Sequence, residues 1–322
     1  MAGIELYAPR PARHRRTWSV AAVVLGIAFM ITGQILGVIP GVALGLMDTE
    51  GTSSGWLGDF YMLVVMFGLA ALMVSGWVLW FERRPLSTIG FNENGLKRFL
   101  SGYAVGLAFL VAIIGVIWVA GGYRSEAGGV FASEGAVAAL LPIGALLLGF
   151  IVQGSTEEIV FRGWLMQLIA SRHGLVIALI VNAVLFGLVH AGNIEPTKEL
   201  ALGVVNIVLF GAFIGLYAAR EGSLWGVCGW HAAWNWLLGL GFGLEVSGHV
   251  MDVKPLVVDL TAADGAPWWL TGATFGPEAS VVTTVILLGA SLWVVMRGPF
   301  NGHATPEPVA PRLAETSETP AT

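Results

Sequence analysis

Long apolar segments separated by short polar connections dominate the hydrophobic pattern of the chain. An apolar bilayer core of about 30 Å is crossed by about 20 residues of helix, and most of these segments have that length. The pattern therefore predicts an all-α, polytopic membrane protein with about eight transmembrane helices. The apolar segments cover residues 18–46, 56–81, 99–120, 136–170, 175–191, 200–219, 224–244 and 279–296.

The fourth apolar segment differs from the others because it contains two adjacent carboxylates, Glu157 and Glu158. No proline interrupts residues 143–170, so we expect one helix there. If it covers 136–170 it is about 52 Å long, which exceeds the apolar core, so part of it should project from the membrane or bend. Ionisable groups at such a depth are costly and usually functional. The acid pair is therefore the first candidate for a site.

Composition supports the membrane class. Hydrophobic residues make up 56% of the chain and charged residues 11%, with a mean hydropathy of +0.78; soluble domains carry about 25% charged residues. A net charge of -5 without a basic face argues against nucleic acid as a partner. The single cysteine, Cys228, excludes an intrachain disulfide.

The distribution of basic residues predicts the orientation. With eight spans, most Arg and Lys side chains fall on one side, which by the positive-inside rule is cytoplasmic. Both termini then lie in the cytoplasm, and we expect a multi-pass protein of a bacterial cytoplasmic membrane. The basic side carries Arg10, Arg13, Arg15, Arg16, Arg83, Arg84, Lys97, Arg98, Arg172, Arg220 and Arg297, and the other side has only Arg124, Lys198 and Lys254.

The same reasoning divides the chain into segments. They are a basic cytoplasmic arm (1–17), spans one to three (18–135), a core of spans four to seven (136–245), an extracytoplasmic loop (246–278), an eighth span (279–297) and a disordered tail (298–322).

Helix geometry predicts a polar layer inside the bundle. Spans four and five form a hairpin, and Glu157 and His190 lie about 20–24 Å from its turn at 1.5 Å per residue. The next hairpin turns on the same side, and His231 lies about 14 Å beyond that turn, with Asn235 one helical turn deeper. We therefore expect two carboxylates, two imidazoles and an amide at roughly one level of an apolar bundle.

These residue types suit peptide hydrolysis. Glu158 and Arg162 are spaced i, i+4, so the arginine can neutralise that carboxylate and fix its rotamer. Glu157 then remains free to act as a general base, and His190 could share the attacking water with it. His231 and Asn235 could support the developing oxyanion, which is usually the largest contribution in acyl transfer.

Two versions of this chemistry stay open. Glu157, His190 and His231 resemble a catalytic zinc set with one open position. A metal-free pair of glutamate and histidine explains the same residues equally well.

A non-proteolytic membrane protein is the alternative reading. Glu158 and Arg162 could be a structural pair only, and His231 and Asn235 could tie helices together by hydrogen bonds. A proton-coupled transporter would show matched broken helices near the midplane, and we find no such pair in the sequence. A catalytically silent scaffold remains compatible with the same layer.

The motifs Glu157-Glu158-x-x-x-Arg162, Phe186-x-x-x-His190 and His231-x-x-x-Asn235, in this order on three spans, resemble those of the CPBP family. These are the CAAX prenyl endopeptidase and bacteriocin-processing (Abi) intramembrane proteases. The resemblance covers residues 136–245.

The resemblance implies an all-helical intramembrane endopeptidase that depends on glutamate and is often classed as a metalloprotease. Glu157 would activate water with His190, His231 and Asn235 would support the oxyanion, and the substrate would be a membrane-bound or lipid-associated peptide or protein. Eukaryotic members remove the last three residues of prenylated proteins, whereas bacterial-type members are linked to bacteriocin maturation or self-immunity. The compact, Ala/Gly/Val-rich chain favours the bacterial type.

Overall fold

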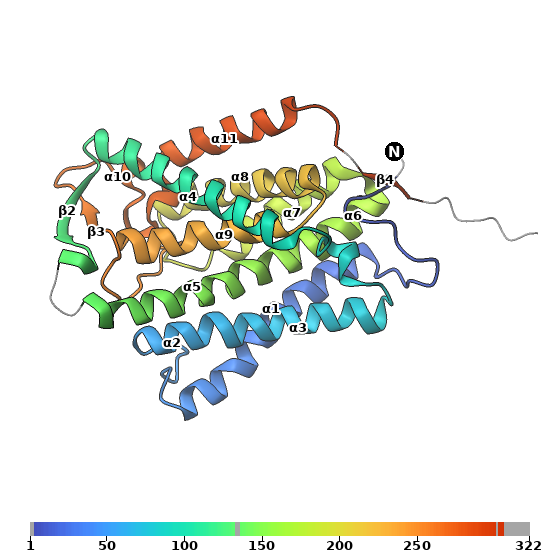
Figure 1. Ribbon diagram of the computed structural model, residues 1–322, viewed down its shortest axis with the longest axis horizontal. Helices are drawn as coiled ribbons and strands as arrows, with labels where there is room; N and C mark the ends of the chain where they lie inside the picture. The colour runs from blue at the N-terminus through green and yellow to red at the C-terminus, as the bar shows by residue number, and fades with distance from the viewer. Residues whose placement is uncertain (1–2, 133–135, 301, 306–322) are drawn as a thin grey trace, which may run out of the picture.

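The computed structural model describes residues 3–132, 136–300 and 302–305. Helices make up most of it, joined by short loops and two small sheets (Figure 1). The main helices are α1 (Ser19–Ala43), α2 (Gly55–Tyr61), α3 (Phe67–Gly76), α4 (Gly95–Val119), α5 (Ala136–Glu158), α6 (Met166–His173), α7 (Leu175–Val189), α8 (Lys198–Glu221), α9 (Trp225–Trp236), α10 (Trp268–Thr271) and α11 (Val281–Met296).

Four π-helical turns continue or join these helices: η1 (Met62–Met66), η2 (Trp77–Phe81), η5 (Ile159–Leu165) and η6 (Leu237–Gly241). Short 3-10 turns are η3 (Leu86–Ile89), η4 (Val130–Ala132), η7 (Ala273–Phe275) and η8 (Pro277–Ala279). The strands are β1 (Ile4–Glu5), β2 (Tyr123–Gly128), β3 (Val258–Ala262) and β4 (His303–Ala304).

The helical membrane class predicted from the apolar segments is confirmed. Five helical stretches in the described chain are long and apolar enough to cross a membrane: Ser19–Ala43, Gly55–Phe81, Gly95–Val119, Val137–His173 and Lys198–Glu221. The apolar helices α7 and α11 are shorter. Each of the eight predicted segments contains a helix, but the number of membrane crossings stays a prediction.

Helix α9 lies at the centre, between α4 and α5 (Figure 1). Its contact with α4 is close because small residues face each other. A Cβ at Gly102 would come within 1.9 Å of the Gly226 carbonyl oxygen, and one at Gly229 within 2.1 Å of the Phe99 carbonyl oxygen. Only glycine fits at such a crossing, as is common between membrane helices. This contact fixes the depth and rotation of α9.

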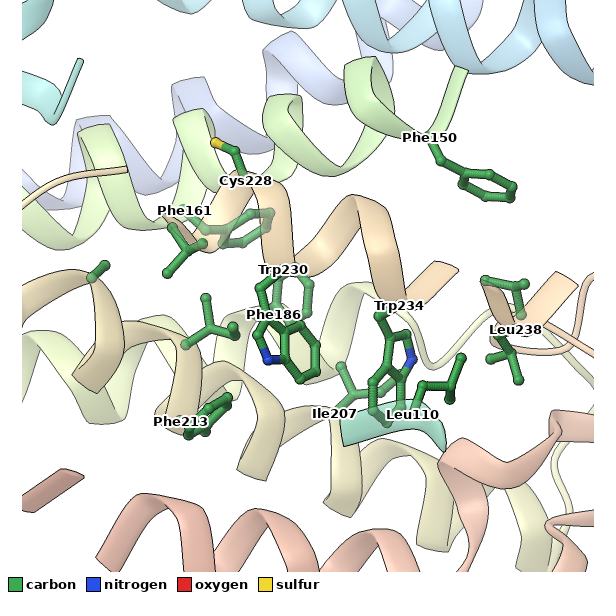
Figure 2. Packing of buried hydrophobic residues seen from close by; sticks show 14 of the residues in the cluster. Leu110, Phe150, Phe161, Phe186, Ile207, Phe213, Cys228, Trp230, Trp234 and Leu238 are labelled. Carbon is green, nitrogen blue, oxygen red and sulfur yellow. The ribbon is translucent and has the colours of Figure 1, made fainter. Parts of the chain in front are cut away.

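Aromatic side chains fill the space between α9 and its neighbours α5, α7 and α8 (Figure 2). Trp230 stacks on Trp234 with ring centroids 5.0 Å apart and contacts Phe213 edge-on at 5.7 Å. Phe161 and Phe186 meet in a T-shaped pair at 5.1 Å. These rings form an apolar surface against which the polar side chains of the bundle pack, Arg162 and His231 among them.

The fourth apolar segment forms one continuous helical stretch, as predicted, and its irregularity lies immediately after the acid pair. The π-helical turn η5 separates α5 from α6 there. Two glycines lie close to the acid pair, and Gly163 is part of this turn. Gly154 lies in regular α-helix, where its added Cβ would be 3.2 Å from Cγ of His231. Gly154 therefore allows α5 and α9 to approach at the level of the acids.

The N-terminal arm is folded onto the helices. Its strand β1 pairs antiparallel with β4, so the two ends of the described chain meet. The Leu6 amide donates to Oε1 of Gln167 on α6 at 2.8 Å, and Leu6 is buried. The predicted disordered tail therefore begins with a paired segment. Residues 306–322 of that tail lie outside the described residues.

The opposite end of the molecule is closed by the second sheet. Strand β2, after α4, pairs antiparallel with β3 in the long loop, with a register irregularity between Ser125 and Ala127. Figure 1 shows this sheet at one end of the helices and β4 with the N-terminus at the other. The predicted loop 246–278 is thus structured by β3, α10 and η7 and by part of η8.

Candidate active site

The acid pair is organised by partners on two helices. Glu158, at the end of α5, accepts a hydrogen bond from an Arg162 Nη1 donor at 3.1 Å. Its Oε1 atom also lies 2.8 Å from Nδ1 of His231 on α9. Both Glu158 and Arg162 are fully buried. Because an ionised carboxylate can only accept, the proton of the Glu158–His231 bond belongs to Nδ1, and Nε2 points away from Glu158.

The Nε2 atom of His231 faces the other acid. It lies 3.6 Å from Oε2 of Glu157, which makes no hydrogen bond to any described residue. Glu157 is only 6% exposed, so this oxygen is free of protein donors although it is largely buried. A buried carboxylate oxygen beside an imidazole nitrogen is suited to accept a proton from a bound molecule.

Gln153 connects the site and was missed by sequence reasoning. Its Nε2 donates to Oε1 of Glu157 at 2.8 Å, and its Oε1 accepts from Nδ2 of Asn235 at 2.9 Å. The amide therefore orients Glu157 and ties it to α9. The only sequence signal was the i, i+4 spacing between Gln153 and Glu157 on one helix face.

Arg162 is held by aromatic rings as well as by Glu158. Its guanidinium carbon lies 4.0 Å from the ring centroid of Phe186 and 5.7 Å from that of Phe210. Arginine over an aromatic face is a favourable arrangement, especially when desolvated. The motif residue Phe186 thus contacts Arg162 through its ring, and it contacts His190 through its carbonyl oxygen.

His190 lies at the end of α7 in the wall of the same cavity. Its Nδ1 is 2.7 Å from the Phe186 carbonyl oxygen, so Nδ1 donates and Nε2 is free. Among the described residues, no hydrogen bond or ion pair joins His190 to Glu157. The structure thus brings Glu157, Glu158 and His231 into direct contact, while His190 shares only their cavity.

A cavity of about 590 Å³ connects these groups. Its polar lining includes Gln153, Glu157, His190, His231 and Asn235. Its walls are mainly apolar and come from α1, η1, α3, α5, α8 and the loops after α7 and η6. The volume is of the size usual for ligand sites, and an apolar wall with a few convergent polar groups is the usual pattern of such sites.

A second polar group closes the far wall of this cavity. Glu278, in η8, accepts from Nε1 of Trp234 at 3.0 Å, and from the amide and hydroxyl of Ser247 at 2.5 and 2.8 Å. It thereby joins the loop after η6 to the core helix α9. Burial raises the pKa of the Glu278 carboxyl above its usual 4.5, and the hydrogen bonds from Ser247 and Trp234 oppose that shift.

This raised pKa predicts a pH effect on stability. A carboxyl with a higher pKa in the folded state contributes stability that is complete below about 4.5 and is lost as the pH rises through the folded value. We expect the melting temperature of wild type minus that of Glu278→Gln to fall as the pH rises from about 4 to neutrality. Thermal unfolding of both proteins in detergent measures this difference, since groups common to both cancel. A difference that is constant with pH, or that increases, contradicts the assignment.

The proposed metal set does not fit this arrangement. Within the described ranges, no group of three or more His, Cys, Asp or Glu side chains converges in a way that could hold an ion. The positions of Glu157, His190 and His231 therefore give no support to the zinc version of the site.

Comparison with known proteins gives two matches. Residues 139–237 match the family model of the type II CAAX prenyl endopeptidases, Rce1-like, and this range contains all seven motif residues. The uncharacterized protein YyaK of Bacillus subtilis (strain 168) is 28% identical over 153 residues, which cover 47% of this chain and 48% of YyaK. The aligned region is thus about half the length of this relative. No solved structure matches the chain.

Proposed function

Because its central helices match the Rce1-like CAAX prenyl endopeptidase family, which confirms the resemblance seen in the motifs, we propose that this membrane protein is an intramembrane endopeptidase. Glu157 is the base that activates the attacking water. The observation that carries this proposal is the free Oε2 atom of Glu157, buried in the cavity and 3.6 Å from Nε2 of His231.

The reaction needs a group that accepts a proton from the attacking water and a way to deliver that proton to the leaving amine. Water attacks the peptide carbon while Glu157 takes one of its protons, so a C–O bond forms and the carbonyl becomes an oxyanion. The C–N bond then breaks, and the same proton passes to the amine nitrogen. The other water proton stays with the new carboxyl group. Nε2 of His231 lies 3.6 Å from Oε2 of Glu157, so it can exchange the transferred proton with Glu157 through one bridging water.

The surrounding groups support these steps. Glu158 fixes the ring orientation of His231, as a carboxylate does for the histidine of a catalytic triad. Asn235 uses one hydrogen of Nδ2 on Gln153, and its second hydrogen is available for the oxyanion. His190 lines the same cavity with Nε2 available, where it can accept a hydrogen bond from the water. We assign the metal-free, glutamate-dependent version of the mechanism on this arrangement.

Proteolysis by the purified protein tests the proposal. The protein in detergent is incubated with a library of apolar peptides, and products are identified by mass spectrometry. Internal cleavage by wild type, absent with a folded Glu157→Gln variant, is the expected result. Cleavage that is equal in both proteins would show a contaminating protease. Absence of cleavage of every peptide by the folded wild type would favour a transporter or silent scaffold.

Gln153→Ala tests whether the hydrogen bond from Gln153 positions Glu157 for its role as the base. Loss of the amide removes the donor to Glu157 and the link to Asn235, so kcat should fall by roughly 10–100-fold, within the range for the loss of a positioning contact. KM should change little, because Gln153 does not hold the substrate. Gln34→Ala is the matched control, since Gln34 lines the cavity without contacting the acids. A kcat of Gln153→Ala equal to that of this control would contradict the role.

A further inference from the structure

The cavity is sealed at the end of the molecule that carries the basic residues. Tyr7 of the N-terminal arm donates its hydroxyl to the carbonyl oxygen of Arg162 at 2.8 Å. Arg10 and Glu5 form a buried ion pair at 2.8 Å, and Gln167 donates to the same Glu5 oxygen. The arm therefore packs on η5 and α6, the part of the helical stretch that follows the acid pair.

A second network seals the neighbouring part of this end. Glu82 accepts from Thr17 at 2.6 Å and from Nε1 of Trp164 at 3.2 Å, and pairs with Arg84 at 2.6 Å. All four residues are buried. Together with the arm they fill this end of the molecule with buried, hydrogen-bonded side chains, and no residue of either network lines the cavity.

The opposite end contributes the outer walls of the cavity. Its lining there includes Asn193 after α7, Val246, Ser247 and Met251 after η6, and Glu278 before α11. These loops belong to the end with β2 and β3 (Figure 1). The cavity thus extends from the acid pair toward the end away from the N-terminal arm.

The charges identify the two ends. In the described chain, eleven Arg and Lys residues lie at or near the sealed end and only Arg124, Lys198 and Lys254 lie at the other. This asymmetry places the sealed end in the cytoplasm by the positive-inside rule. The cavity then faces the extracytoplasmic side of the membrane.

The lining also indicates how a peptide is recognised. No Lys or Arg side chain lines the cavity among the described residues, whereas the wall carries Glu157 and Glu278. Binding of a free C-terminal carboxylate usually uses a cationic partner or a nest of backbone amides. Apolar walls without a cation favour an internal, uncharged peptide segment.

We propose that the substrates are apolar internal segments of membrane-anchored proteins or peptides presented at the extracytoplasmic face, and that the protein does not act on cytoplasmic C-termini. This inference rests on the proposed endopeptidase function and specifies the side from which that site is reached. Cleavage would release the part of the substrate that lies outside the membrane.

Cysteine accessibility tests the direction of access. Met30 lines the cavity, and Leu36 on the same helix is exposed on its outer surface and does not line it. We expect Met30→Cys to react with a small, charged, membrane-impermeant thiol reagent added to intact cells, and Leu36→Cys to react far less. Wild type, with only the buried Cys228, sets the background.

Two exposed positions calibrate the sides. Thr52→Cys should react from outside and Lys97→Cys only in inverted vesicles. Reaction of Met30→Cys only in inverted vesicles would overturn the inference. So would labelling of Lys97→Cys from outside, because it would reverse the orientation.

A paired reporter then tests the substrate class. A peptide cleaved by the purified protein is placed beside a single-span anchor, on the extracytoplasmic side in one fusion and the cytoplasmic side in the other, and each is co-expressed with the protein. Cleavage of the extracytoplasmic fusion at least tenfold above the other, lost with Glu157→Gln, is the expected result. Preferential cleavage of the cytoplasmic fusion would reject this inference while leaving the endopeptidase proposal intact. Failure of the detergent assay itself would reject the endopeptidase proposal.

Discussion

Glu157→Gln should reduce peptide cleavage by about 10²–10⁴-fold, the contribution typical of a positioned general base. The amide has nearly the same shape as the carboxylate and can still accept from Gln153 through its oxygen, but it cannot take a proton from water. The melting temperature should therefore stay close to that of wild type. Single-turnover rates in detergent and thermal unfolding measure the two quantities on the same preparation.

Asn235→Ala gives a graded comparison for this result. Its loss removes the donor to the oxyanion and the hydrogen bond to Gln153, so kcat should fall by about 10²–10³-fold. Gln34→Ala, at another polar position of the cavity wall, should stay within a few-fold of wild type. Near-normal cleavage by folded Glu157→Gln would remove the base from the mechanism, because the neighbouring Glu158 is occupied by Arg162 and His231.

Arg162→Ala should destabilise the folded protein by about 3–5 kcal/mol, the usual effect of leaving one member of a buried ion pair without its partner. Glu158 would remain fully buried with only His231 beside it, and the rings of Phe186 and Phe210 would lose the guanidinium they contact. Thermal or denaturant unfolding in detergent measures the loss.

Arg124→Ala is the matched control for this change. Arg124 forms a surface pair with Asp264 at 3.9 Å, and both side chains are more than half exposed, so its loss should cost less than about 1 kcal/mol. The double variant Glu158→Gln/Arg162→Met removes both charges and should be more stable than Arg162→Ala. If the double variant is the less stable of the two, the stranded charge is not the cause.

The helix positions and the level of the acids could be predicted because membrane helices have a fixed rise per residue and a characteristic apolar length. Glu157, His231 and Asn235 were accordingly expected in one layer. Their pairing could not be predicted, because a small change in helix rotation decides which carboxylate meets the imidazole. The expected partner of Glu157 was His190, whereas the structure places His231 beside both acids.

Other features depend on contacts between residues far apart in the chain. Gln153 is an uncharged residue at the end of an apolar run, so its sequence carries little sign that it bonds Asn235, 82 residues away. Glu5 and Tyr7 likewise belong to a short polar arm whose composition is typical of an exposed segment. Only their packing on α6 and η5 shows that they complete the core.

The π-helical turn η5 connects α5, which carries the acid pair, to α6, which binds the N-terminal arm. Such a turn accommodates an additional residue without ending the helix. Shortening it by one residue would rotate everything beyond it by about 100° about the helix axis. Glu157 and Glu158 would keep their places, while Gln167 and Ser171 would turn away from the N-terminal arm that they bind. The turn thus sets the rotation of α6, which binds the N-terminal arm, relative to α5, which carries the acid pair.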